Sequence, residues 1–297
     1  MLPIINLSYI IATHNRFTFL KITLDRLINK IQPGEEIVVV DGDSTDGSKE
    51  YLQQLFEQRK IHQFVSEPDR NQAHAWNKAM LMAKGIVIKK IIDDDVFCYD
   101  AIRKCKQFML QNPTVDLVIS NDLSSTLNNY KEIQKHSRLP QFQNWAGGAT
   151  PSFTFGDVHM LIRKSSLAFI GLYNTDFVMM DWEYSLRVSY LKANIAYYTG
   201  YNALSVAHPD TTTSKKNERL IKSQGQSVSC LYEYKGDDAA ISIWSKIKIR
   251  GGRLLSRTKK ASNFQAAPPA IGEVYQFYYD YLSEINGDNE FQFIQRT

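Results

Sequence analysis

The chain has 297 residues, 43% of them hydrophobic, so it can bury a core large enough for one or two domains. Its formal net charge is +4, which is too small to indicate binding to nucleic acid. Three cysteines without a CxxC pair predict neither a disulfide framework nor a zinc site, and they suit a reducing compartment. No run of eighteen apolar residues occurs, so a membrane-spanning helix is not expected.

The first third of the chain alternates between apolar, β-rich runs and segments with helical periodicity. The spacing predicts strands at 7–12, 36–40, 61–65 and 86–92, and helices at 19–28, 49–59 and 72–84. This alternation implies a parallel, doubly wound sheet. Polar residues follow each strand, and ligands bind outside the carboxyl ends of such strands. The pattern is typical of a nucleotide-binding half.

The pattern is weaker in the second part of the chain. The spacing predicts strands at 115–120, 158–162 and 195–198, helices at 100–111, 164–169 and 179–191, and a last amphipathic helix at 274–285. The segment 121–155 is the least regular, and 206–214 is predicted as a loop. We expect an acceptor to bind over 121–198, because irregular segments adapt most easily to a ligand.

A basic segment follows residue 214. Residues 239–272 include seven lysines or arginines and no acidic residue, with apolar side chains between them. Such a segment can lie on an anionic membrane surface, although a solvated helix face is the more common explanation. We expect a peripheral membrane contact through 246–260.

Three consecutive carboxylates, Asp93, Asp94 and Asp95, follow the predicted strand at 86–92. Like charges this close repel each other, and a divalent cation with oxygen ligands would relieve the repulsion. The alternative is a polar loop whose aspartates cap the next helix. The motifs GxGxxG and GxxxxGK[ST] are absent, which disfavours a dinucleotide-binding enzyme and a P-loop NTPase. Carboxylates with a metal suit a substrate that carries a diphosphate, since the metal neutralises a phosphate leaving group.

A set of motifs resembles family 2 glycosyltransferases of the GT-A fold in both order and spacing. The motifs are SYIIATHNR at 8–16, VVVDGDSTDGS at 38–48, SEPDR at 66–70 with AWNKA at 75–79, IIDDDV at 91–96, GLY with DWEYSLR at 171–187, and HPDTTTS at 208–214. The resemblance implies an α/β GT-A fold, Rossmann-like, with a mostly parallel central sheet flanked by helices. It divides the chain into a nucleotide-sugar-binding half (1–97), an acceptor-binding half (98–214) and a mainly helical C-terminal extension (215–297).

The resemblance also implies a set of nucleotide-binding residues in the first half of the chain. Thr13 and Arg16 are expected beside the nucleotide, and Asp41 is expected to face the base. Asp69 and Arg70 are expected to close on the nucleobase or its ribose. We assign Asp93, next to the metal-binding position, to the nucleotide as well.

For metal binding and catalysis, the resemblance points to residues in three separate motifs. Asp94 takes the place of the metal-binding aspartate of the family's DxD motif, and Asp95 lies beside it. His208 matches a histidine that can approach the metal, which is expected to be Mn²⁺ or Mg²⁺. Asp181 matches the catalytic base of the inverting members, although a carboxylate near a helix N-terminus is also favoured by the helix dipole without any function.

Three positions depart from the family pattern. Ile92 occupies the place of the first acidic or Asn residue of DxD, so metal binding rests on the second half of the motif. Asp43 stands where Gly or Asn is usual, and His74 stands where Asp is frequent. The nucleotide preference is therefore left open.

The resemblance predicts an inverting, metal-dependent glycosyltransferase that uses a nucleotide-sugar donor, with UDP as the expected nucleotide. The acceptor would be a glycan or a lipid-linked glycan in cell-surface polysaccharide biosynthesis. We expect a cytoplasmic protein, peripheral to the inner face of the membrane, and no nucleic-acid partner. The apolar N-terminus has no basic region before it, so it is expected to be a strand rather than a signal peptide.

Two other classes of function stay open from the sequence alone. The stretch VVVDGDST also looks like the DxDx[TV] motif of haloacid-dehalogenase-type phosphohydrolases, with Asp41 as nucleophile and Asp43 as acid/base. The order of the later motifs counts against this class. A non-catalytic module that binds a nucleotide sugar or glycan is the second alternative, against which the presence of both Asp94 and Asp181 argues.

Overall fold

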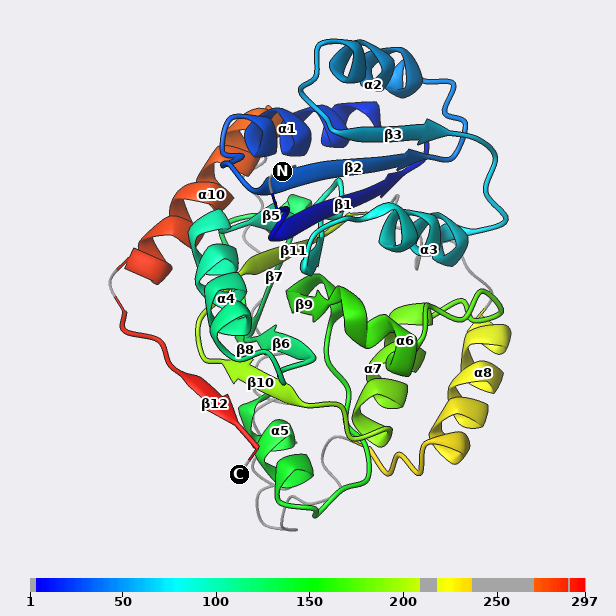
Figure 1. Cartoon of the computed structure of the whole chain (residues 1–297), viewed down its shortest axis with the longest axis vertical. Coiled ribbons are helices and arrows are strands. Elements are labelled where there is room, and N and C mark those ends of the chain that lie inside the picture. Colours follow the sequence, from blue (N-terminus) through cyan, green and yellow to red (C-terminus); the bar gives the residue numbers. More distant parts are fainter. Residues whose placement is uncertain (1–3, 209–217, 237–269, 288, 297) are drawn as a thin grey trace, which may run out of the picture.

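The computed structural model describes residues 4–208, 218–236, 270–287 and 289–296. An eight-stranded sheet runs through the molecule in the order β12-β10-β6-β9-β4-β1-β2-β3 (Figure 1). In chain order these strands are β1 (Leu7–Thr13), β2 (Glu35–Asp41), β3 (Gln63–Ser66), β4 (Val87–Lys90), β6 (Leu117–Ser120), β9 (Met160–Arg163), β10 (Ile195–Tyr198) and β12 (Phe293–Gln295). Most neighbours are parallel, while β9 is antiparallel to β4 and β6 and β12 is antiparallel to β10. The predicted mostly parallel central sheet is confirmed.

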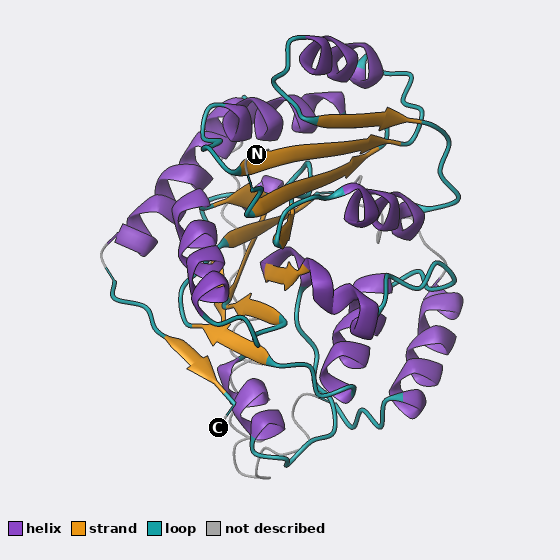
Figure 2. Ribbon diagram, viewed as in Figure 1, coloured by secondary structure: helices purple, strands orange, loops and turns teal. Residues whose placement is uncertain are grey.

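Helices cover both faces of this sheet (Figure 2). Their bounds are α1 (Phe17–Ile28), α2 (Ser48–Glu57), α3 (Gln72–Met82), α4 (Tyr99–Gln111), α5 (Leu139–Ala146), α6 (Leu167–Ile170), α7 (Met180–Tyr190), α8 (Glu218–Leu231) and α10 (Ile271–Gly287). Short 3₁₀ turns lie at η1 (Leu127–Asn129), η2 (Asp157–His159) and η3 (Lys164–Ser166). The helices predicted from hydrophobic periodicity are confirmed to within three residues at each end, except that 164–169 divides into η3 and α6.

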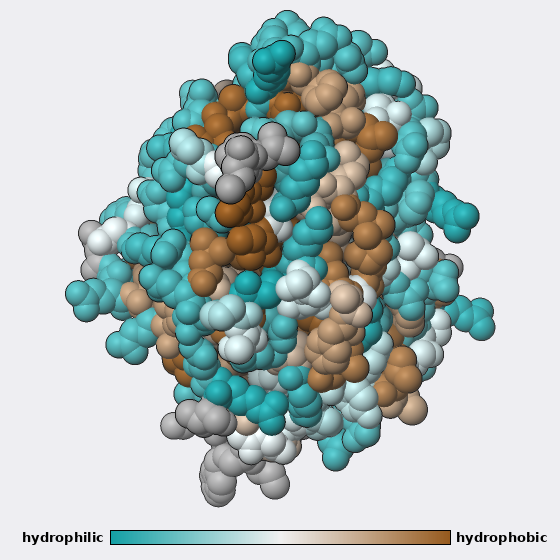
Figure 3. Space-filling view, in the orientation of Figure 1, coloured by the Kyte–Doolittle hydropathy of each residue, from teal (hydrophilic) through white to brown (hydrophobic). Residues whose placement is uncertain are grey.

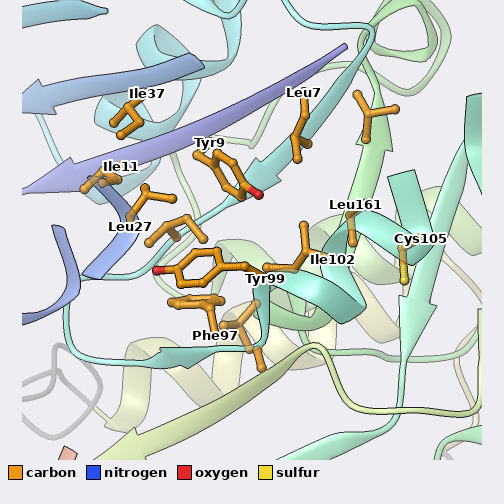
Figure 4. Close-up of a cluster of buried hydrophobic side chains, with 14 of the residues drawn as sticks. Leu7, Tyr9, Ile11, Leu27, Ile37, Phe97, Tyr99, Ile102, Cys105 and Leu161 are labelled. Carbon is orange, nitrogen blue, oxygen red and sulfur yellow. The ribbon is translucent and has the colours of Figure 1, made fainter. Parts of the chain in front are cut away.

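Side-chain alternation along the strands produces two hydrophobic cores. Leu7, Tyr9 and Ile11 of β1 point to one face, where they pack with α1, α2 and α4 (Figure 4). Ile10 points to the other face, where α3, α5 and α7 supply the apolar side chains. Because successive strand residues face opposite sides, a continuous apolar run such as that of β2 is buried on both faces.

A second, four-stranded sheet lies beside the first, in the order β5-β11-β7-β8. Its strands are β5 (Val96–Phe97), β7 (Asp122–Thr126), β8 (Gln134–His136) and β11 (Ala203–Ala207). The prediction of an irregular segment over 121–155 is therefore wrong in part, because β7, β8 and α5 lie within it. These short strands carry polar residues at most positions, so their pairing comes from distant partners rather than from a local apolar pattern.

Gly85 lies between α3 and β4, where the chain passes close to β1. Helix α3 ends at Met82, with Ala83 in the C-cap position. A Cβ atom on Gly85 would lie 2.6 Å from the main-chain nitrogen of Ser8. The chain therefore needs glycine here because it passes directly against β1 before entering the sheet.

The described part of the C-terminal extension packs closely on the rest of the fold. Helix α10 buries Val274, Tyr275, Tyr278, Tyr279 and Leu282 against the four-stranded sheet. Helix α8 packs against α7, where Gly225 lies over the ring of Trp182. The predicted last amphipathic helix is confirmed, whereas the basic segment 246–260 lies outside the described residues. The division into 1–97, 98–214 and 215–297 stays a prediction.

The surface in the view of Figure 3 has hydrophobic side chains gathered toward its middle and hydrophilic side chains around them. None of the helices within the described ranges combines the length and the apolar character that crossing a bilayer requires.

Candidate active site

A cavity of about 1060 Å³ opens at the carboxyl ends of β1 and β4. Its wall includes Ala12 and Thr13 at the end of β1, and Gly42 after β2. The acidic run after β4 and the first turn of α7 also line it. The strands thus deliver polar side chains from distant parts of the sequence to one crevice, as expected for ligand sites in parallel sheets.

The three aspartates of the acidic run each bind a different partner in the protein. Asp93 accepts a hydrogen bond from the hydroxyl of Thr13 at 2.7 Å, and Asp95 accepts one from the N–H of Val206 at 2.8 Å. One carboxylate oxygen of Asp94 lies 2.5 Å from the guanidinium of Arg16 and 2.8 Å from Nε2 of His208. These protein groups therefore relieve part of the electrostatic repulsion between the three adjacent carboxylates.

Burial is the main cause of the raised pKa values of Asp93 and Asp95. It raises the pKa of Asp93 to about 7, and the neighbouring charge of Asp94 adds to the rise. Burial also raises the pKa of Asp95 well above its usual range, again with a contribution from Asp94. Asp94, between them, is the member that contacts the guanidinium of Arg16 and the imidazole of His208.

The predicted metal ligands are brought together only in part. Asp94 and His208, 114 residues apart in the chain, meet at one oxygen. Asp95 turns its carboxylate toward the main chain of β11 instead. Within the described ranges, no three His, Cys, Asp or Glu side chains converge as a group that could hold a metal ion. A carboxylate and an imidazole are both ligands that Mn²⁺ accepts, so this pair fits the metal when the diphosphate supplies further oxygens.

Helix α10 supports the acidic run from behind. The hydroxyl of Tyr275 donates to the main-chain oxygen of Asp94 at 2.5 Å. Phe19 stacks on the ring of His208 with centroids 4.7 Å apart, and it also contacts Tyr275. Helix α10 therefore contacts the Asp94 loop directly, and it reaches His208 through Phe19 of α1.

Four of the six predicted nucleotide-binding residues line the cavity: Thr13, Arg16, Asp69 and Asp93. Asp69 forms ion pairs with Lys78 at 2.6 Å and with His74 at 3.3 Å. His74 stands where the family often has an aspartate, and its imidazole contacts the carboxylate of Asp69.

The two other predicted nucleotide-binding residues, Asp41 and Arg70, do not line the cavity. Asp41 is completely buried, and its carboxylate accepts hydrogen bonds from Ser44 and from the hydroxyl of Ser66. Arg70 is an exposed residue at the end of its loop. The role of Asp41 in this structure is to fix the loop after β2, because its hydrogen bonds close that turn.

Asp43, the unusual residue in that loop, has a positive φ of 62° and forms an ion pair with Lys49. A left-handed backbone favours Gly or Asn, which explains why those residues are usual at this position. Aspartate is tolerated because its short side chain bonds locally.

Asp181 lies in the first turn of α7 and faces the cavity. Burial raises its pKa, and the charge of Asp157 raises it further, while Lys90 and the main-chain N–H of Trp182 act in the opposite direction. The N-terminal end of a helix favours a negative charge. The carboxylate therefore combines a raised basicity with access to a ligand, as a general base requires.

Three residues of this end of the cavity escaped the sequence prediction. Lys90 of β4 forms a buried ion pair with Asp157 of η2. The hydroxyl of Tyr173 donates to the same carboxylate at 2.7 Å, and the ammonium of Lys90 lies 4.5 Å from the ring centre of Trp76. The available signal was the pair of lysines, Lys89 and Lys90, inside an otherwise apolar strand, since a buried lysine requires a partner.

The sheet order, the strand-end cavity and its carboxylates define a GT-A class α/β fold with a C-terminal helical extension. Residues 8–171, more than half of the chain, match the family model described as "Glycosyl transferase family 2". The chain belongs to this family and is a glycosyltransferase.

Curated relatives carry related names. Poly-beta-1,6-N-acetyl-D-glucosamine synthase of Staphylococcus epidermidis is 24% identical over 251 residues, which is 82% of this chain and 58% of the synthase. The putative teichuronic acid biosynthesis glycosyltransferase TuaG of Bacillus subtilis is 30% identical over 105 residues, which is 35% of this chain and 42% of TuaG. The chain therefore spans less than two thirds of the length of either relative.

Solved structures share the fold. S. aureus TarS 1-349 in complex with UDP-GlcNAc gives a TM-score of 0.57 with 16% identity, over 84% of this chain and 71% of that one. The mannosyltransferase PcManGT of Pyrobaculum calidifontis in complex with GDP-Man and Mn²⁺ gives 0.54 with 15% identity, over 96% and 87%. At these identities the likeness supports the fold alone.

Proposed function

We propose that the protein is an inverting, metal-dependent glycosyltransferase that moves a sugar from a UDP-sugar to a hydroxyl of a glycan or lipid-linked acceptor. The observation that carries this proposal is one cavity with two chemically different ends. One end is lined by Asp94, whose carboxylate contacts His208 outside the cavity lining, and the other is lined by Asp181 with an accessible carboxylate. A leaving diphosphate needs positive charge, and an attacking hydroxyl needs a base, so the two ends suit the two halves of a displacement.

In the proposed reaction, Asp181 accepts the proton of the acceptor hydroxyl. The hydroxyl oxygen forms its bond to the anomeric carbon on the face opposite the diphosphate, and the bond from that carbon to the diphosphate oxygen breaks. The nucleoside diphosphate leaves with the bonding electrons, so the configuration at the anomeric carbon inverts. The deprotonating base is expected to contribute about 10²- to 10⁴-fold to the rate.

Asp94 and His208 are the residues that we propose to hold a divalent metal, Mn²⁺ or Mg²⁺. A bound metal would supply Lewis-acid stabilisation of the diphosphate. Arg16 lies on the same oxygen of Asp94, so it must give up or share that contact when a metal binds. Its guanidinium could then also contact phosphate oxygens, for which its fork of N–H donors is well suited.

The proposed donor, acceptor and location draw support from the relatives. TarS was solved with UDP-GlcNAc and the mannosyltransferase with GDP-Man and Mn²⁺. The curated relatives are named for poly-beta-1,6-N-acetyl-D-glucosamine and teichuronic acid, which favours a role in cell-surface polysaccharide biosynthesis.

We propose 1–97 as the donor half, 98–214 as the acceptor half, and 246–260 as a peripheral membrane contact. Charge reversal in 246–260 should then reduce vesicle co-flotation, and an unchanged flotation would exclude the contact.

The phosphohydrolase alternative needs Asp41 as a nucleophile in a substrate site. Asp41 is completely buried, is bonded to Ser44 and Ser66, and lies outside the residues that line the cavity. Its carboxylate is thus held as a structural group, and the family assignment replaces this alternative.

The test is a screen of nucleotide sugars for transfer and donor hydrolysis by the purified chain with Mn²⁺, repeated with Asp181→Asn. We expect turnover of a UDP-sugar by the wild type and a loss of about 10²- to 10⁴-fold in the variant, with donor affinity by calorimetry unchanged. A variant that keeps nearly full turnover would refute Asp181 as the base. Donor binding without any turnover by the wild type would favour the non-catalytic module.

A further inference from the structure

A buried ion pair between Lys90 and Asp157 lines the cavity that Asp181 also lines. Lys90 and Asp157 are each only 4% exposed, and both line the cavity. Tyr173 donates its hydroxyl to the same oxygen of Asp157 that Lys90 contacts. The rings of Trp76 and Tyr173 lie 4.5 and 5.3 Å from the Lys90 ammonium, so aromatic faces surround the charge.

Burying such a pair is costly for folding. Removing both ions from water costs several kcal/mol, and well-packed apolar residues of similar volume are often as stable. A pair of this kind that faces a ligand cavity, rather than the interior alone, therefore calls for a functional explanation. Asp157 and Asp181 come from different elements, η2 and α7, and share this end of the cavity.

Two charges from other elements act on Asp181: Asp157 of η2 raises its pKa, and Lys90 of β4 lowers it. The neutral hydroxyl of Tyr173, on the loop before α7, bonds to Asp157. On α7 itself, Glu183 is bonded to Arg187 and to the hydroxyl of Tyr232, so its carboxylate is occupied on the side of α8. Asp157 and Asp181 thus share the field of one ammonium, which also lowers the pKa of Asp95.

We propose that Lys90 is a positioning residue for sugar transfer: its ammonium balances the charge of Asp157, so that Asp181 can accept the proton of the acceptor hydroxyl. Without Lys90, the two carboxylates repel each other without a compensating charge, so the ionised form of Asp181 becomes less favourable. This inference rests on the proposed role of Asp181 as base. It gives Lys90 of β4 a role in proton transfer that is separate from the proposed metal binding by the acidic run after this strand.

The sign of the expected pH effect follows from the charges. The working form of Asp181 is the carboxylate, so turnover falls as pH falls through its pKa, which burial and Asp157 already raise. Loss of the Lys90 charge raises this pKa further and moves the acid limb of the pH profile to higher pH. Loss of the Asp157 charge lowers it and moves the limb to lower pH. Loss of both charges should return the limb near its original position.

The experiment measures kcat against pH for the full chain with a saturating UDP-sugar, from about pH 5 to about pH 9. We expect Lys90→Met to move the acid limb up by about one unit, which is about tenfold in kcat below the limb, with recovery at high pH. Asp157→Asn should move it down, and the double variant should lie close to wild type. Lys164→Met is the matched control, because that lysine bonds the main-chain oxygen of Ala83 and does not line the cavity.

A loss of kcat that is equal at every pH in Lys90→Met would overturn the proposal in favour of a purely structural role. A double variant that is no better than Lys90→Met would also overturn it. A second readout separates this failure from failure of the proposed base. The midpoint of the Asp181 carboxyl titration, followed by ¹³C NMR, should rise in Lys90→Met whether or not Asp181→Asn keeps turnover, and an unmoved midpoint refutes the charge balance.

Discussion

The two ends of the cavity handle buried carboxylates in different ways. At the end that we propose for the donor (the donor end), Asp93, Asp94 and Asp95 have separate contact partners, supplied by Thr13, Arg16 with His208, and the main chain of β11. At the end that we propose for the acceptor (the acceptor end), the ammonium of Lys90 contacts Asp157 and lowers the pKa of Asp181. Each carboxylate of the donor end therefore has its own contact, although Lys90 also lowers the pKa of Asp95, whereas the acceptor end has one ammonium for two carboxylates.

This difference indicates which contact at each end can change during the proposed reaction. At the donor end, the guanidinium of Arg16 contacts Asp94, and a divalent metal would compete with this side chain for the carboxylate. At the acceptor end, the ammonium of Lys90 is held between Asp157, Trp76 and Tyr173, and we propose that a proton moves there. Mutations should therefore affect metal and donor binding at one end and the pH profile at the other.

The largest expected effect at the donor end is that of Asp94→Asn. An amide is a weaker metal ligand than a carboxylate, and a metal contributes several kcal/mol to stabilising the leaving group, so turnover should fall by at least about 100-fold. Titration with Mn²⁺ in the presence of UDP should show the loss of metal binding. Asp95→Asn is the control with a smaller effect, because its amide oxygen can still accept the N–H of Val206.

Arg16→Gln should have the opposite effect on metal binding at the same site. The arginine occupies one carboxylate oxygen of Asp94 and would compete with a metal for that carboxylate, so its removal should tighten Mn²⁺ binding to the free protein by about fivefold. Electron paramagnetic resonance of free Mn²⁺ measures this directly. Weaker Mn²⁺ binding in the variant would mean that Arg16 and the metal do not compete for Asp94.

Local patterns were sufficient to predict the main sheet and most of its helices. The runs around Val38 and Ile10 are buried on both faces, and such continuous apolar runs between helical segments predict parallel strands. The strands of the second sheet were missed because residues such as Asp122 and Ser124 give no apolar alternation. Their pairing depends on partners such as Leu204, about eighty residues away, which a local pattern does not contain.

The candidate site was predictable where motif order carried the information. Asp94 and His208 meet as the resemblance implied, although 114 residues separate them. Asp41 failed to reach the cavity because the direction of a side chain at a strand end depends on the turn that follows, here closed by Ser44. The Lys90–Asp157 pair was missed because 67 residues separate its members and neither belongs to a motif.

The smallest expected effect concerns Tyr275→Phe on helix α10. Removing the hydroxyl that bonds the main-chain oxygen of Asp94 should cost about 1 kcal/mol of stability and weaken UDP binding with Mn²⁺ by about fivefold. The acid limb of the pH profile should not move, because Tyr275 acts at the donor end. Tyr278→Phe, on the same helix, is the matched control: it loses a hydrogen bond to Ser125 of β7, so it should lose similar stability but keep its UDP affinity. Equal UDP affinity in both variants would show that α10 stabilises the fold without positioning the Asp94 loop.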